Sequence, residues 1–61
     1  MRLTGIDIEC TNGQSYFHQG RFIDQYHLNY KDGIIRIEQN NGHLVEYNFN
    51  NIVRISIIRE D

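Results

Sequence analysis

Hydrophobic and polar residues alternate with a period of two along most of the chain, and this pattern predicts β-strands. Ile6, Ile8 and Cys10 alternate with Asp7 and Glu9, so the strand that they predict has one apolar face and one acidic face. Because Cys10 shares the parity of the two isoleucines, we expect its thiol to lie in the core.

Turn residues separate this strand from the next ones. Leu3 is out of phase with the first apolar run, and Gly5 is a natural place for a β-bulge that shifts the register by one residue. Tight hairpin turns are expected at Asn12-Gly13, Asp32-Gly33 and Asn41-Gly42, because these pairs favour left-handed backbone conformations. Further strands are predicted at residues 14–18, 25–30, 34–38, 43–49 and 52–59.

Two residues limit the second and third of these strands. Gly20 breaks the strand that precedes it. Asp24 has an inward parity, so we expect the regular part of the next strand to begin at Gln25.

The last segment has two interpretations. Its apolar residues partly fit the three-four spacing of a helix capped by Asn50 or Asn51. However, five of the seven residues from 52 to 58 are Ile or Val. These side chains are stiff at χ1 and favour strands, so we predict a strand.

The predicted fold is all-β: an antiparallel meander of five or six strands in which each strand pairs with its sequence neighbour. Such a meander closes into a small SH3-like or Sm-like barrel, or it remains an open curved sheet. An open sheet would leave an apolar face and two free edges that need covering. The 61 residues have room for a single small β domain, residues 1–61.

The chain also contains a short internal similarity. Residues 8–13 and residues 37–42 share four of six positions. One interpretation is that the chain holds two copies of a three-stranded unit. The other is that any Asn-Gly hairpin with an outward Glu has such a sequence.

The small size of the chain limits its stability. Ordering the chain costs roughly 1.5 kcal/mol per residue, and a chain of this length buries only about 60% of its unfolded surface. Disulfides, metals or partner subunits commonly supplement such a core. Cys10 is the only cysteine, which excludes a disulfide within the chain and is typical of a reducing cytoplasm. We therefore predict a homodimer or a tight complex with another protein.

The candidate chemical groups do not form a recognisable catalytic or metal-binding motif. His18, His27 and His43 lack the close spacing of zinc ligands. Ser15 and Ser56 do not lie on a nucleophile elbow, and no glycine-rich phosphate loop is present. The sequence therefore predicts a protein that is not an enzyme and that has no metal or other cofactor.

Charge and hydropathy bear on the class of partner. The net charge is −2, and six basic residues are scattered among eight acidic ones, which argues against nucleic acid as the partner. Aromatic side chains on a sheet face keep a nucleic-acid-binding barrel as an alternative. These aromatic residues are Tyr16, Phe17, Phe22, Tyr26 and Tyr30. No apolar stretch is long enough to predict a membrane span or a signal peptide.

Two predicted strands carry isoleucine on both faces. A strand with one solvated face should alternate cleanly, whereas a strand covered on both faces need not. The alternative is that the extra isoleucines merely lie at strand ends, where isolated exposed Ile is normal. We predict that the C-terminal strand contacts a second subunit or a target. The predicted interface residues are Ile34, Ile52, Arg54, Ser56 and Ile58.

The composition carries one resemblance. Ile and Asn recur in pairs at Ile34-Ile35, Ile57-Ile58, Asn40-Asn41 and Asn50-Asn51, while Pro, Trp and Ala are absent. With the size and the hairpin layout, this composition resembles that of the short all-β accessory and inhibitor proteins of phages and mobile elements of Gram-positive bacteria. The resemblance includes no motif, so it transfers no functional residue.

The resemblance implies a non-enzymatic protein-binding module: a phage-encoded, stoichiometric inhibitor of a bacterial host or defence protein. Such a protein would act as a homodimer in the host cell cytoplasm. The alternatives are a small structural or regulatory subunit of a larger assembly and a nucleic-acid-binding small β-barrel.

Overall fold

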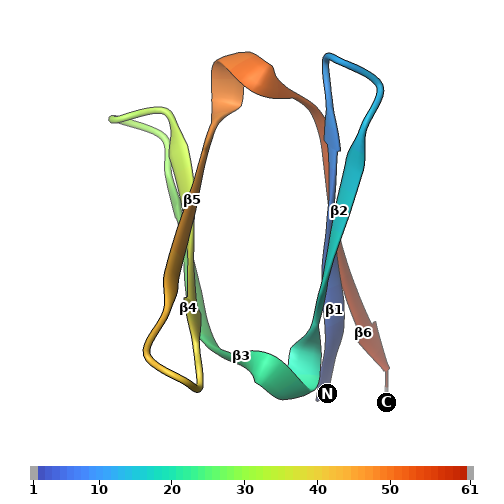
Figure 1. Cartoon of the computed structure of the whole chain (residues 1–61), viewed down its shortest axis with the longest axis vertical. Helices are drawn as coiled ribbons and strands as arrows, with labels where there is room; N and C mark the ends of the chain where they lie inside the picture. Colours follow the sequence, from blue (N-terminus) through green and yellow to red (C-terminus); the bar gives the residue numbers. More distant parts are fainter. Residues whose placement is uncertain (1, 61) are drawn as a thin grey trace.

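The chain folds into six β-strands and two single-turn 3₁₀-helices in the computed structural model, which describes residues 2–60 (Figure 1). The strands are β1 (Arg2–Cys10), β2 (Ser15–Gln19), β3 (Ile23–Asn29), β4 (Ile34–Gln39), β5 (Leu44–Asn48) and β6 (Ile52–Glu60), and the helices are η1 (Gly20–Phe22) and η2 (Phe49–Asn51). The predicted all-β antiparallel class is confirmed, and so is the strand at the end of the chain. Met1 and Asp61, which the predicted domain includes, lie outside the described residues.

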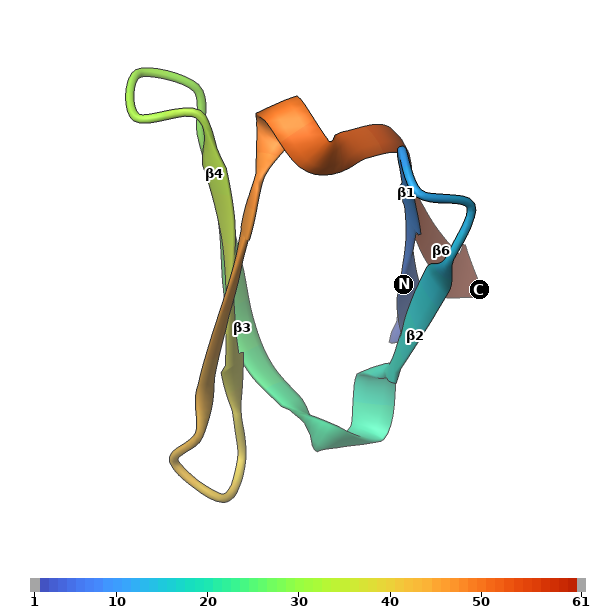
Figure 2. The same ribbon diagram turned by 45° about the horizontal axis from the view of Figure 1, so that its top comes forward.

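The strands form two three-stranded sheets that face each other (Figures 1 and 2). Sheet A has the order β2-β1-β6, and sheet B has the order β3-β4-β5. Over residues 2–60 the sheets do not close into a barrel, and they are not one open sheet. The predicted meander is wrong at two points, because β2 does not pair with β3 and β5 does not pair with β6.

The two 3₁₀-helices explain this departure from a meander. They lie at opposite ends of the molecule and carry the chain from one sheet to the other (Figure 1). In η2 the Asn50 backbone N–H donates a hydrogen bond to the Asn48 side chain over 2.9 Å. In η1 the backbone of Gly20 lies against the backbone of Leu3, where a side chain would not fit. Each helix thus turns the chain away from the strand that it follows, and β1 pairs with β6 instead.

The second half of the chain repeats the structure of the first half. His18 and Tyr47 are counterparts, and they are 29 residues apart. Ile6 of β1 pairs with His18 of β2, and Ile35 of β4 pairs with Tyr47 of β5. The other residue pairs of these strands correspond in the same way, with an offset of 29 residues. The pairing of β3 with β4 is repeated by that of β6 with β1. The structure therefore contains two copies of a three-stranded unit, and each unit gives its third strand to the sheet of the other.

The repeat includes a register irregularity near the start of β3 and of β6. Asp24 is the extra residue in β3, and its counterpart Val53 is the extra residue in β6. The prediction that regular pairing in β3 begins at Gln25 is confirmed. In β6 the bulge reverses the expected parity, so Ile52 packs against the core and Val53 lies at the surface. A strict alternation with Ile55 and Ile57 would place Val53 on the core side.

The positions of the three predicted hairpin turns are confirmed, but within residues 2–60 only the glycine of each pair, and not Asn12, Asp32 or Asn41, has a positive φ angle. Gly13, Gly33 and Gly42 have φ angles of 88°, 71° and 88°, in the left-handed region that glycine adopts readily. In the first and third turns, Asn12 and Asn41 each accept a hydrogen bond from the backbone N–H two residues later. The predicted register shift near Gly5 is also present, between Leu3 and Gly5.

The core lies between the central strands of the two sheets. Its fully or nearly fully buried members are Ile6, Ile8, Cys10, Ile35 and Ile37. The predicted burial of the Cys10 thiol is confirmed. The edge strands contribute only partly buried side chains around this cluster, so the interior is small and the inner faces of the edge strands stay accessible.

Candidate protein interface around strand β6

Strand β6 is the longest edge strand among the described residues. It has nine residues, whereas β2 and β5 have five and β3 has seven. Its register with β1 is regular from Arg54 to Ile58. The free side of an edge strand presents unpaired N–H and C=O groups, which can pair with a strand of another chain. Strand β6 is therefore the principal pairing edge of the structure that residues 2–60 form.

An apolar groove lies between β6 and β3, the edge strand of the facing sheet. We call it the β3–β6 groove. Its lining residues are Leu28, Tyr30, Phe49, Ile52, Val53, Arg54, Ile55 and Ile57, and its volume is about 320 Å³. Tyr30 is 77% exposed and Val53 is 64% exposed. The rings of Tyr30 and Phe49 contact each other with centroids 5.7 Å apart. Most of the groove surface is therefore aliphatic or aromatic.

The internal repeat provides a comparison for this groove. At the other end of the same side of the molecule, the counterpart of Val53 is Asp24 and the counterpart of Tyr30 is Arg59. There the Arg59 guanidinium donates a hydrogen bond to the Tyr26 hydroxyl and links β6 to β3. One end of this side is thus polar and bridged, while the other end is apolar and open.

Three of the predicted interface residues form one row along β6, and Arg54, at one end of this row, also borders the groove. Arg54, Ser56 and Ile58 lie on the outer face of sheet A, where Ile58 is opposite Gly5. The ring of Phe17 lies over Gly5 and would overlap any side chain there. Phe17 and Ile58 are both exposed, so these two side chains form a small apolar patch on the outer face of sheet A.

The structure does not bring the other two predicted interface residues into that row. Ile34 lies on β4, in the centre of sheet B, on the other side of the molecule. Ile52 packs against the core and forms part of the groove. The predicted set is therefore divided among three places, and its role in an interface stays a prediction.

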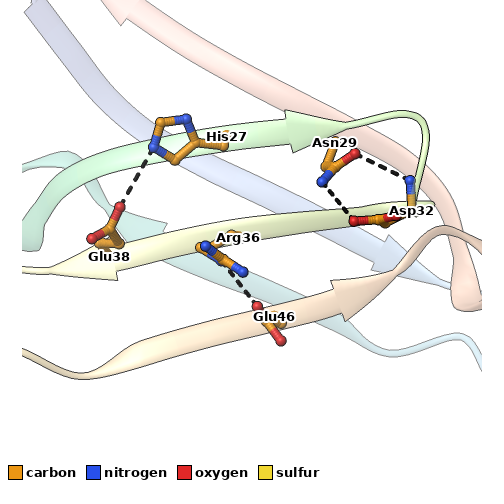
Figure 3. A network of polar contacts seen from close by, with 6 residues as sticks. All are labelled: His27, Asn29, Asp32, Arg36, Glu38 and Glu46. Atoms are coloured by element: carbon orange, nitrogen blue, oxygen red, sulfur yellow. Dashed lines mark hydrogen bonds and ion pairs between the residues drawn. The ribbon is translucent and has the colours of Figure 1, made fainter.

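The outer face of sheet B differs in its chemistry. Its polar side chains contact one another: Arg36 and Glu46 at 3.0 Å, His27 and Glu38 at 3.5 Å, and Asn29 and Asp32 at 3.0 Å (Figure 3). Exposed ion pairs of this kind contribute little to stability, but they keep a sheet face solvated. This face is a typical solvent-facing surface.

The alternation pattern alone does not mark the groove residues Tyr30, Phe49 and Val53 as one site. Tyr30 and Phe49 are the last residues of the strands predicted at residues 25–30 and 43–49. The signal that could have found them is the repeat itself. An alignment of the two halves with the 29-residue offset places Val53 at the position of the charged Asp24.

Aromatic side chains close the other open side of the two sheets, between β2 and β5. The Tyr47 hydroxyl lies 2.7 Å from His18 Nε2, and the rings of Tyr16 and Tyr47 have centroids 5.9 Å apart. Burial lowers the pKa of His18 from its ordinary value. Burial, with smaller contributions from Cys10 and Tyr16, raises the pKa of Tyr47. The folded protein therefore favours the neutral forms of both groups.

This contact predicts that stability falls in mild acid. An unfolded His18 takes up a proton near pH 6.5, whereas the folded state resists protonation until a lower pH. The unfolding free energy should therefore decrease as pH falls from about 6.5 through the pKa of His18 in the folded state. Urea unfolding followed by circular dichroism at a series of pH values would measure this slope. A His18→Gln variant should reduce the slope, and an unchanged slope in this variant would contradict the assignment to His18.

Comparison of the chain with protein-family models, with curated proteins and with solved structures gave no match. In residues 2–60, no three His, Cys, Asp or Glu side chains gather closely enough to hold a metal ion. No helix in the same part of the chain is long and apolar enough to cross a membrane.

Proposed function

We propose that the protein is a non-catalytic protein-binding module whose β3–β6 groove receives apolar side chains of a partner protein. The observation that supports this proposal is the exposure of Tyr30 and Val53 beside Phe49, over a floor of Leu28 and Ile57. Contiguous apolar surface of this kind is typical of protein interaction sites. Concave shape and aromatic content are also typical of the sites that hold most of the binding energy.

The charges around the groove favour a protein over nucleic acid. Among the lining residues that the structure describes, Arg54 is the only cation, and its Nη2 lies 3.1 Å from Glu9 Oε1. Phosphate recognition needs several unpaired cations along a track. The aromatic residues are also dispersed, because Tyr16 and Tyr47 lie on the opposite side of the molecule from Tyr30. They do not form one stacking platform for successive bases.

The role of such a module depends on what it binds. An inhibitor of a bacterial host or defence protein, as the compositional resemblance implies, would hold one enzyme in a fixed ratio. A small subunit of a larger assembly would hold structural proteins through the same groove. Capture from a bacterial lysate, followed by mass spectrometry, distinguishes these two roles by the identity of the captured protein.

Replacing Val53 with aspartate is expected to weaken capture of the partner at least about tenfold, or roughly 1.4 kcal/mol. The change places a charge at the apolar rim of the groove. The backbone should accept it, because Asp24 already occupies the counterpart position in the other unit. The measurement is the dissociation constant of the purified partner, with circular dichroism as the test of folding.

Asp24→Asn is the matched control, since it alters the equivalent bulge outside the groove. Its dissociation constant should equal that of the unaltered protein. Equal binding by the Val53→Asp variant would exclude the groove as the docking site. Recovery of nucleic acid in place of a protein would support the alternative of a nucleic-acid-binding protein.

A further inference from the structure

The regular part of β6 presents different chemistry on its two faces. Ile55 and Ile57 face the groove, and Arg54, Ser56 and Ile58 face outward. At the ends of this stretch, Arg54 pairs with Glu9 and Glu60 pairs with Arg2, both of them on β1. The side chains of Arg54 and Glu60 nevertheless remain 68% and 50% exposed. Each can therefore face a further charge on the outer side of the sheet.

We infer that β6 pairs with β6 of a second copy, in antiparallel register about a twofold axis through Ile57. When a strand pairs with a copy of itself about a twofold axis, residues that lie directly opposite each other must have their side chains on the same face of the sheet. This condition holds only when the axis passes through a residue and not between two residues. With the axis at Ile57, Arg54 lies opposite Glu60 of the second copy, and the symmetry forms this pair twice. Opposite charges that face each other across strands stabilise the pairing.

Neighbouring registers lack this complementarity. An axis through Ser56 places Ile52 opposite Glu60 and Val53 opposite Arg59. An axis through Ile58 places Ser56 opposite Glu60. Neither register brings opposite charges together, and the first places a charge against an apolar residue at both ends.

The register at Ile57 also suits the inner face. On this face the Ile57 side chains of the two copies lie opposite each other, and the aliphatic stem of Arg59 lies along Ile55 of the second copy. The two A sheets become one six-stranded sheet, and the unpaired backbone groups of both edges are satisfied. The bulge at Val53 ends the regular edge, so Val53 stays outside the pairing, whereas Ile55 and Ile57, which also line the groove, lie within it. The inference rests on the regular part of β6 and its charges, and not on the proposed docking in the groove.

Charge exchange tests the register. Sedimentation velocity at micromolar concentration should show a dimer for the unaltered chain, and its dissociation constant should rise at least about tenfold in Arg54→Glu and in Glu60→Arg. The double variant, Arg54→Glu with Glu60→Arg, should recover most of the lost affinity. Because the double change still breaks both ion pairs within the chain, with Glu9 and with Arg2, such a recovery can come only from contact between copies.

Glu46→Arg is the control, since it changes a similar ion pair on the outer face of sheet B and should leave the dimer unchanged. A monomer for the unaltered chain would overturn the inference. A dimer that is insensitive to both single changes, or that the double change does not restore, would overturn the register. Circular dichroism confirms that each variant keeps its β-structure.

Discussion

Replacing Ile37 with alanine is expected to remove most of the folding stability of the protein. The Ile37 side chain is 0% exposed and lies on β4, the central strand of sheet B. Truncating a buried isoleucine to alanine costs about 2–5 kcal/mol, because the transfer free energy is lost and a cavity remains. A domain this small is held by a net stability of only about 3–5 kcal/mol. Urea unfolding followed by circular dichroism would measure the loss.

The repeat supplies a matched comparison for this prediction. Ile8 is the counterpart of Ile37 on β1 and is also 0% exposed, so Ile8→Ala should cost a similar amount. Ile37→Val removes one methyl group and should cost about 0.5–1.5 kcal/mol, leaving the protein folded. A loss below about 1 kcal/mol in Ile37→Ala would mean that the central strands do not carry the core.

Gly20→Ala is expected to cost about 1–3 kcal/mol or more, although it adds only one methyl group. The added Cβ would overlap the backbone carbonyl of Leu3, and backbone moves less easily than a side chain. The φ angle of Gly20 is not in the left-handed region, so close approach is the cause of the loss. The expected result is a lower urea midpoint with an unchanged slope.

Gly13→Ala separates close approach from backbone strain. Gly13 has free space around it but a φ angle of 88°, so alanine there should cost only about 1–2 kcal/mol of left-handed strain. Phe49 occupies the counterpart position of Gly20, which means that this type of turn accepts a side chain where no backbone lies against it. A smaller loss of unfolding free energy for Gly20→Ala than for Gly13→Ala would mean that the backbone of Leu3 shifts easily to make room for the added methyl group.

The strands and hairpins could be predicted because their signals are local. Period-two alternation identifies a strand and its inward face, and an Asn-Gly pair identifies its turn. The division into two sheets could not be predicted, because alternation does not say which strand a given strand pairs with. That choice depends on η1 and η2, where the sequence marks Gly20 only as a strand break and Asn50 only as the cap of an alternative helix. The pairing of β1 with β6 joins residues that are far apart in the sequence.

The candidate site could be predicted only in part, for a related reason. Arg54, Ser56 and Ile58 were placed together because they follow a simple alternation within one strand. The exposure of Val53 depends on a bulge relative to β1, and a bulge is a property of two strands rather than of one. Tyr30 becomes part of the groove only because η2 brings Phe49 beside it.

The exchange of third strands between the two units has a consequence for synthesis on the ribosome. When β1, β2, η1 and β3 have emerged, β3 has no sheet to join, because its partner β4 is not yet made. Sheet A also lacks one edge until the last strand, β6, reaches β1. Contacts between distant segments form slowly, since a long loop must close first. The chain should therefore complete its fold only after β6 has left the exit tunnel, in one late and cooperative step.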